Sequence, residues 1–315
     1  MSLRESITAQ IIAAIEAGTP PWRQGWSSPE QPRNAKTGQA YRGINFLILQ
    51  SLCQDQYTDP RWLTFKQAES MNVKIKRGSK GCRIVKMVEV DRNRAEKLQD
   101  GEVLAEEKGK ALVMKSYVVF NAEQIEGLPA LPPPTKNRVE PVAVLDAVIE
   151  GMKGTGLTVQ YGGGQPAYAP LTDTVRMPLP ERFNSTEQFS ATFLHELAHS
   201  SGHKSRLNRL NLYARFGSEE YGREELRAEM ASAFLGPQLG LPMSSSMMES
   251  HASYVASWLS VLKQDKNEIF RAAADAQKIA DYINQFAVGI QPSVAQQMVS
   301  DPSHDMQPVG LGPRP

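Results

Sequence analysis

Residues 185–209, STEQFSATFLHELAHSSGHKSRLNR, hold the pattern that decides the fold of the second half of the chain. Ser185, followed three residues later by Gln188, forms a capping box, which is a usual start of a helix. Gly202 is suited to end the same helix in a left-handed turn. Between these signals the apolar residues recur at helical spacing. We therefore predict an apolar, well-capped helix from about residue 186 to 201.

The histidines of this helix predict a metal site. His195 and His199 are four residues apart, so their imidazoles project from one face of the helix and can share one zinc ion. Glu196 stands next to the first histidine, where its carboxylate can act as a catalytic general base. Such a pentapeptide also arises by chance, and two histidines can simply lie on the exposed surface of a helix and contribute to solubility. Three of the five histidines fall within 195–203, however, which favours one zinc ion per chain.

A catalytic zinc ion needs a third protein ligand. His203 is a poor match, because a glycine interrupts the helix before it and the metzincin spacing would require a histidine where Ser205 stands. The next helical segment, 222–235, places Glu225 and Glu229 on one face, beside an apolar stripe. A carboxylate there is costly unless a metal or an arginine compensates it. We predict Glu229 as the third ligand, ahead of Glu225, because it is embedded more deeply in the apolar sequence.

Composition sets the broad class of the protein. The 315 residues allow two domains, and 35 Lys and Arg nearly balance 34 Asp and Glu. Cys53 and Cys82 have no metal-like spacing and predict no disulfide, which suits a reducing cytoplasm. The first residues lack the unbroken apolar run of a signal peptide, and no segment has the roughly 20 apolar residues of a membrane span. We expect a soluble, cytoplasmic protein without a membrane partner.

The chain divides at a proline-rich segment. Consecutive prolines favour an extended linker over 131–141. We predict an N-terminal domain over 1–130, a C-terminal domain over 142–290 and a disordered tail over 291–315. The periodicities predict an α+β fold with strands and helices in both domains. The expected elements are strands at 83–90, 112–120, 157–161 and 167–177, a charged, solvated excursion at 91–110, and helices at 44–52, 142–152, 186–201, 219–235 and 248–286.

The N-terminal domain carries a basic segment, although the net charge of the whole chain is close to zero. Eleven basic and three acidic residues lie between positions 33 and 86, with aromatic residues interleaved. Single-stranded nucleic acid is bound in this way, by basic groups on phosphates and aromatic faces on bases. Alternatively, the aromatic residues belong to the core and the lysines to an ordinary solvated surface. The candidate DNA-binding residues are Arg33, Lys36, Tyr41, Arg42, Trp62, Lys66, Lys76, Arg77 and Lys80, with Tyr41 and Trp62 as stacking candidates.

Several of these motifs together resemble the ArdC-type antirestriction proteins of conjugative plasmids. The resemblance lies in HELAH at 195–199 with GHKSRLNR at 202–209, in EELRAE at 224–229, and in NAKTG, YRGIN, WLTFKQA and KRGSKG between 34 and 81. It implies an N-terminal domain that binds single-stranded DNA and a gluzincin-like metallopeptidase domain with a small sheet and helices. It also implies protection of incoming plasmid DNA from restriction, with single-stranded DNA and an unidentified protein or peptide substrate as partners.

Two other interpretations remain open at the level of sequence. In the first, zinc only stabilises the fold and the protein protects DNA by coating it. In the second, the chain is a general cytosolic zinc peptidase whose basic segment binds acidic protein substrates.

Overall fold

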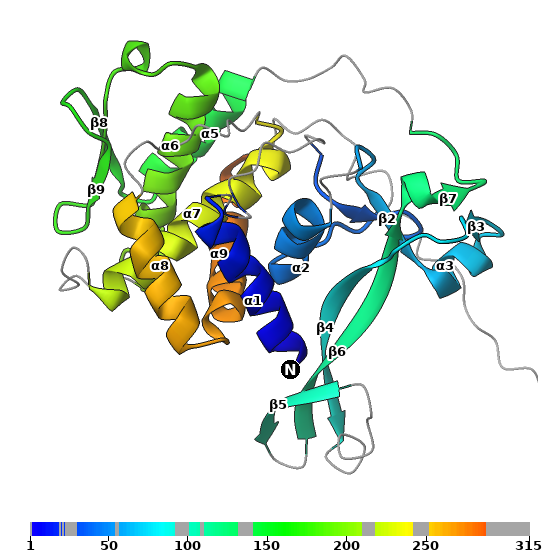
Figure 1. The fold of residues 1–315 in the computed structure, drawn as a ribbon. Coiled ribbons are helices and arrows are strands. Elements are labelled where there is room, and N and C mark those ends of the chain that lie inside the picture. Colours follow the sequence, from blue (N-terminus) through cyan, green and yellow to red (C-terminus); the bar gives the residue numbers. More distant parts are fainter. Residues whose placement is uncertain are drawn as a thin grey trace, which may run out of the picture.

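The computed structural model describes residues 2–18, 20, 22, 30–53, 57–91, 101–107, 110–131, 141–209, 218–241 and 252–287. The predicted tail and all but the two ends of the predicted linker lie outside these residues. Sheets and helices are both present in each half of the described chain, which confirms the α+β class (Figure 1).

A five-stranded sheet forms the centre of the N-terminal half. Its strands follow the order β1-β2-β6-β4, and β5 pairs with β6. The strands are β1 (Arg33–Asn34), β2 (Arg61–Thr64), β4 (Cys82–Asp91), β5 (Gly101–Glu107) and β6 (Lys110–Asn121). In Figure 1 the long strands β4 and β6 form a twisted ribbon that extends away from the helices.

Strand β5 corrects one expectation from the sequence. Residues 91–110 were predicted to be a solvated excursion, but 101–107 pair antiparallel with β6 from Gly101↔Lys115 to Glu107↔Lys110. Charged side chains are tolerated on an edge strand and discourage its pairing with other chains. A charged segment therefore indicates a sheet edge as well as a loop.

A second, smaller core lies at the far end of the sheet. Helix α3 (Phe65–Ser70) begins with a capping box in which Thr64 and Gln67 bond each other's backbone. Its buried Ala68 packs in one cluster with Leu63 and Ile125. The two-stranded sheet of β3 (Lys74–Ile75) and β7 (Ile125–Glu126) closes this end.

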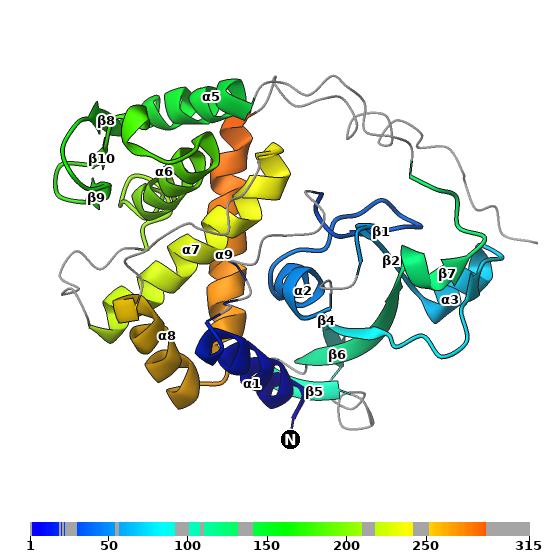
Figure 2. The same ribbon diagram turned by 45° about the horizontal axis from the view of Figure 1, so that its top comes forward.

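Helices dominate the C-terminal half. They are α5 (Pro141–Lys153), α6 (Thr186–Ser200), α7 (Glu219–Leu239), α8 (Ala252–Gln264) and α9 (Glu268–Asn284), and Figure 2 shows α7 crossing between α6 and α9. The helix predicted over 248–286 is two helices. They separate where Asp265 accepts the N–H of Asn267 (2.8 Å), a local turn that competes with helical hydrogen bonds. Among the described residues, no helix combines the length and apolar character needed to cross a bilayer.

A small sheet lies beside α6. Strand β10 (Thr174–Met177) pairs with β8 (Thr158–Tyr161) in parallel and with β9 (Ala167–Ala169) antiparallel. The single strand predicted over 167–177 is thus a hairpin of β9 and β10. Asp173 allows the turn by adopting a positive φ of 47°, a conformation that aspartate tolerates better than most residues.

The first helix of the chain packs against the last ones. Helix α1 (Leu3–Glu16) lies beside α8 and α9 (Figures 1 and 2). Trp22 meets Trp258 edge to face at 5.5 Å, and Thr8 donates a hydrogen bond to the backbone oxygen of Lys266 at 2.8 Å. One continuous cluster of buried apolar residues consequently runs through both halves of the chain.

The structure joins Cys53 and Cys82 by a disulfide, with their Cα atoms 6.1 Å apart and a sequence separation of 29. This contradicts the expectation that the chain forms no disulfide. Cys82 begins β4, and Cys53 directly follows the short π-helix η1 (Ile48–Leu52). Their proximity comes from the packing of η1 on β4, which the sequence spacing does not encode.

We expect reduction of this disulfide to destabilise the protein by about 2–4 kcal/mol, because it frees a loop of this length in the unfolded chain. The measurement is the denaturant midpoint with and without dithiothreitol. The matched control is the double variant Cys53→Ser, Cys82→Ser, whose midpoint should not respond to the reductant. An equal shift in both proteins would contradict the expectation.

Candidate metal centre

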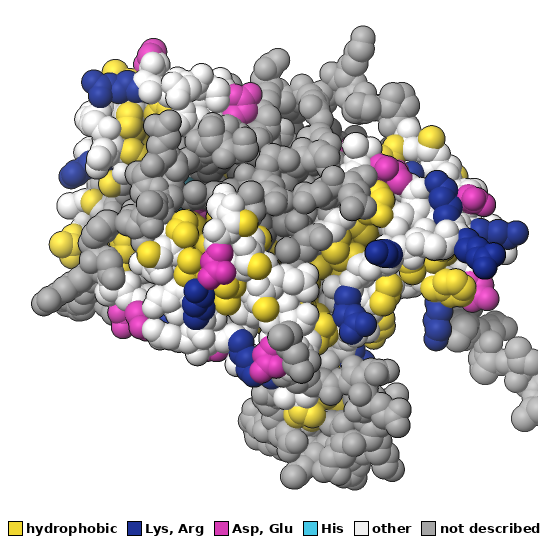
Figure 3. All heavy atoms as spheres, in the orientation of Figure 1, with side chains coloured by type: hydrophobic (Ala, Val, Ile, Leu, Met, Phe, Trp, Pro, Cys, Tyr) yellow, Lys and Arg dark blue, Asp and Glu magenta, His cyan; other side chains and the backbone are white. Residues whose placement is uncertain are grey.

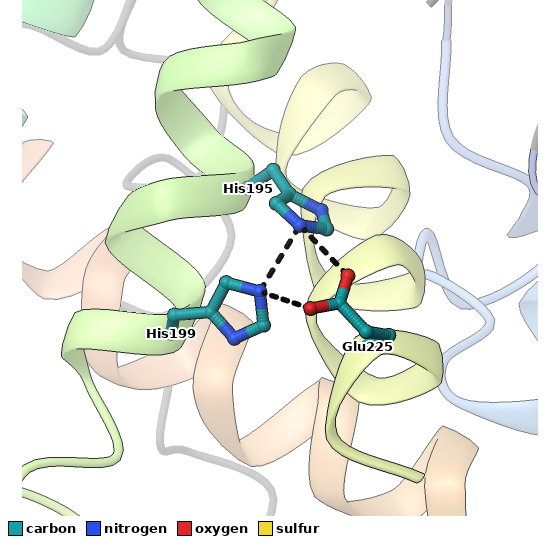
Figure 4. A group of neighbouring side chains, drawn as sticks. All are labelled: His195, His199 and Glu225. Carbon is teal, nitrogen blue, oxygen red and sulfur yellow. Dashed lines mark hydrogen bonds and ion pairs between the residues drawn. The ribbon is translucent and has the colours of Figure 1, made fainter. Parts of the chain in front are cut away.

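Two helices bring three metal-ligating side chains together. His195 and His199 extend from α6 and Glu225 extends from α7 (Figure 4). The two imidazole Nε2 atoms lie 3.1 Å apart. Glu225 Oε2 is 3.4 Å from His195 Nε2, and its Oε1 is 3.4 Å from His199 Nε2. Within the described residues these three form a group whose ligand atoms all lie within 4.8 Å of one another.

Carboxylates also stand behind both rings. Glu224 Oε1 lies 3.0 Å from Nδ1 of His199, and Glu229 Oε2 lies 3.3 Å from Nδ1 of His195. A carboxylate at Nδ1 orients an imidazole and leaves its Nε2 available as a ligand. Glu224 is itself held by Arg209 Nη1 at 3.0 Å. No periodic signal in the sequence singled out Glu224, since it directly precedes the ligand candidate on the helix.

In the structure Glu225, and not the predicted Glu229, lies in the candidate metal-binding group. Glu225 faces the space between the two Nε2 atoms, whereas Glu229 approaches the opposite side of the His195 ring. Both are buried, so depth in the apolar stripe did not distinguish them. His203 lies outside the group, as expected, and its Nδ1 is 2.8 Å from the hydroxyl of Ser205.

The electrostatics of the group favour positive charge. Burial lowers the pKa of His199, but the charge of Glu225 and the hydrogen bonds with Glu224 and Glu225 outweigh burial and raise that pKa to about 9. Burial raises the pKa of Glu225, but the two histidines outweigh burial and hold that pKa far below its ordinary value. A pocket that stabilises protonated imidazoles beside carboxylates has the charge distribution that a cation requires.

Glu196 lies on α6 beside the first ligand and is buried. Burial raises the pKa of its carboxyl, while the charges of His195 and His199 oppose this rise. The backbone N–H of Tyr168 in β9 donates a hydrogen bond to the same carboxylate. The predicted general base therefore stands between the histidines and the strand β9.

A buried arginine fixes the position of β9 relative to α6. Arg206 Nε donates to the backbone oxygen of Ser200 at 2.7 Å, near the end of α6. Its Nη1 donates to Asp173 Oδ2 at 3.0 Å, and Asp173 Oδ1 accepts the hydroxyl of Tyr168 at 2.8 Å. The Arg206 side chain is 0% exposed. This network ties the β9–β10 hairpin to the helix that carries the histidines.

Of the two stacking candidates of the N-terminal half, one is buried and the other is half-buried. Trp62 is 1% exposed and packs edge to face on Tyr57 at 5.9 Å. Tyr41 is half-buried, and its hydroxyl accepts a hydrogen bond from Asn34 at 3.2 Å. Trp62 thus belongs to the core, which was the alternative interpretation of the aromatic residues.

The structure divides the predicted basic residues into two groups. Some have partners: Arg33 pairs with Glu30, Arg42 with Asp281, Lys36 Nζ with the hydroxyl of Ser70, and Lys76 Nζ with the backbone oxygen of Glu123. The others are exposed and have no ion pair among the described residues: Lys66, Arg77 and Lys80.

Comparison with known proteins identifies the family. Residues 1–120 match the model of the N-terminal domain of anti-restriction factor ArdC, and residues 146–275 match a zincin-like metallopeptidase domain. The chain is 36% identical to an uncharacterised protein, y4eC, of Sinorhizobium fredii (strain NBRC 101917 / NGR234), covering 89% of this chain and 91% of the relative.

Two proteins of Escherichia coli named DNA primase TraC are 36% and 38% identical over 94% and 90% of this chain. They are much longer, so the chain spans only 28% and 20% of their lengths.

Comparison with solved structures points to the same family as the sequence comparison. The metal-free crystal structure of the antirestriction protein ArdC from plasmid R388 matches with a TM-score of 0.73 at 36% identity, covering 93% of this chain and 100% of that one. Its Mn(II)-bound structure gives a TM-score of 0.73 at 35% identity, with coverage of 92% and 100%. With both domain models matched in order and a full-length structural counterpart, the chain belongs to the ArdC family of antirestriction proteins.

Proposed function

We propose that His195, His199 and Glu225 hold one divalent metal ion, and that zinc is the ion they suit best. The observation that carries this proposal is the convergence of their three ligand atoms. Two imidazole nitrogens and one carboxylate oxygen form the donor set of many catalytic zinc sites, which leave a fourth position open. The surroundings fit a cation, because further carboxylates on α6 and α7 add negative charge that a dication offsets. The Mn(II)-bound structure of the R388 protein supports a divalent ion.

We propose that this centre hydrolyses a peptide bond. When bound, the metal supplies Lewis-acid chemistry that polarises a scissile carbonyl. Glu196 takes a proton from the attacking water and later delivers it to the leaving amine. Its raised pKa suits a base that must hold a proton between these steps. Among the described strands β9 pairs only with β10, so its other edge can accept an extended peptide as an added strand.

We propose that the N-terminal half binds single-stranded DNA and that the protein protects plasmid DNA entering a recipient cell during conjugation. Exposed basic side chains that have no ion pair with another described residue support this binding mode. Protection from restriction is suggested by the ArdC protein of R388, which is named for antirestriction. Such a role places the protein in the cytoplasm of the cell that receives the plasmid.

One variant separates the proposed peptide hydrolysis from the proposed DNA binding. We expect Glu196→Gln to keep its metal and its affinity for oligothymidine, while hydrolysis of a peptide library falls about 10²- to 10⁴-fold, because the base is lost and the ligands are not. Cleavage is followed by mass spectrometry, DNA binding by fluorescence anisotropy and metal content by elemental analysis. The matched control is Glu181→Gln, an exposed glutamate outside the centre.

The outcomes bear on each part of the proposal. A metal-loaded wild-type protein that cleaves no peptide in the library contradicts the peptidase, and a wild-type protein that does not retain oligothymidine contradicts the DNA-binding half. Equal protection of plasmid DNA by the wild type and Glu196→Gln in a restricting recipient would assign protection to DNA binding alone.

A further inference from the structure

The unpaired basic residues gather at one end of the N-terminal sheet. Lys66 lies in the first turn of α3, Arg77 and Lys80 lie between β3 and β4, and Arg83 lies on β4. All four are exposed, and none has an ion pair among the described residues. The exposed acidic residues of this end, Glu69, Glu123 and Glu126, are outnumbered by the basic ones, because Lys74 and Lys76 are exposed there as well. Figure 3 shows Lys and Arg side chains over the region of α3 and β3, with hydrophobic side chains between them.

An exposed aromatic ring stands at the same end of the sheet. Phe65 is 64% exposed, although the helix it begins buries Ala68 and covers a small core. It directly follows Thr64, which pairs with Val119 at the end of β2. A single exposed apolar residue is common on protein surfaces, so its neighbours decide whether it has a role.

Phe65 begins α3 directly after the last residue of β2 that pairs with β6, near the part of β6 that pairs with Arg83. Val118 is the next residue of β6 after the Thr64–Val119 pair, it is 42% exposed, and it pairs with Arg83 across β4. Gly81 precedes that strand, and a Cβ at this position would lie 2.3 Å from Val118 Cγ1. Because Gly81 has no side chain, the backbone can lie close to Val118. The basic side chains of β4 and α3 lie on either side of this apolar residue.

A flat exposed ring beside several unpaired cations fits a polymer with planar bases and a charged backbone. The bases of a duplex are stacked inside it, so only an unpaired strand can lay a base on such a ring. The phosphates of the same strand then lie within reach of the long basic side chains. An acidic peptide would satisfy the charges but has no general need of an exposed aromatic face.

We propose that Phe65 is the stacking platform for an unpaired base of single-stranded DNA, and that Lys66, Lys80 and Arg83 bind the flanking phosphates. The proposal rests on the DNA binding proposed above and specifies its site. It replaces Trp62 and Tyr41, which the fold uses for packing. It also predicts that the paired arginine Arg33 contributes little.

The test compares two probes that carry the same phosphates. Anisotropy is measured for labelled oligothymidine and for an oligomer of equal length made of abasic sites, with the full chain. We expect Phe65→Ala to weaken binding of oligothymidine about 5- to 150-fold, the range for one stacked base, and to leave the abasic oligomer unaffected. Phe65→Trp should restore binding. The control Tyr117→Ala removes an exposed aromatic residue that points to the opposite face of β6.

The charges are tested by the salt dependence of the same binding. Lys80→Ala and Arg83→Ala should each reduce the slope of log affinity against log salt by about 0.7 on single strands, whereas Arg33→Ala should leave it unchanged. If the wild type binds oligothymidine and Phe65→Ala binds it equally well, the stacking site is wrong while the proposed DNA binding stands. If the wild type binds neither probe, both proposals fail.

Discussion

Replacing Glu225 with alanine is expected to remove the metal ion from the protein. The wild type should carry about one zinc ion per chain after loading and dialysis, and Glu225→Ala should carry almost none. The reason is geometric: the Glu225 carboxylate contacts both Nε2 atoms, and no other carboxylate of the described residues faces the space between them. Metal content is measured by elemental analysis.

Glu229→Ala is the informative companion variant. Glu229 contacts Nδ1 of His195, behind the ring, so its loss should weaken zinc binding by about 10- to 100-fold without emptying a site loaded with excess zinc. Glu220→Ala, an exposed glutamate at the start of the same helix, should bind zinc as the wild type does. The opposite result, an empty Glu229→Ala and a loaded Glu225→Ala, would restore Glu229 as the third ligand.

Replacing Arg206 with alanine is expected to destabilise the protein by about 3–5 kcal/mol, the usual cost of removing one partner of a buried ion pair. The change leaves Asp173 without its guanidinium, and the carbonyl of Ser200 keeps only the backbone N–H of His203 as a donor. It also releases the β9–β10 hairpin from α6, so metal-dependent peptide hydrolysis should fall together with stability. The free energy of unfolding is measured by chemical denaturation.

The control for this variant is Lys153→Ala. Lys153 pairs with Glu150 at 2.8 Å on the exposed surface of α5, and such pairs contribute roughly 0–1 kcal/mol. A loss of less than about 1 kcal/mol in Arg206→Ala as well would show that the buried network is not an anchor.

The metal-binding helix was predictable because its signals are local. His195, Glu196 and His199 lie within one turn and a half of a helix whose capping residue, Ser185, accepts the predicted hydrogen bond from Gln188 at 3.1 Å. The candidate for the third ligand was not predictable in the same way. Glu225 and Glu229 are one turn apart on the same helix, and only the rotation of α7 against α6 decides which of them faces Nε2.

The surface proposed to bind DNA shows a second feature that the sequence alone could not predict. Both faces of β2 are covered, so the run from Trp62 to Phe65 carries no alternation that would distinguish the buried ring from the exposed one. The partner of Arg42 is Asp281, 239 residues away in the sequence. Whether a basic residue is free to meet a phosphate depends on such distant pairings.

The packing of α1 against α8 has a consequence for biosynthesis. The ribosome makes the first helix long before the helices that cover it, on the order of 10–50 seconds earlier at usual rates of synthesis. During that time Ile7, Ile11 and Ile15, which are buried in the finished protein, lack the partners that α8 provides. The final packing of α1 must therefore follow the translation of α8.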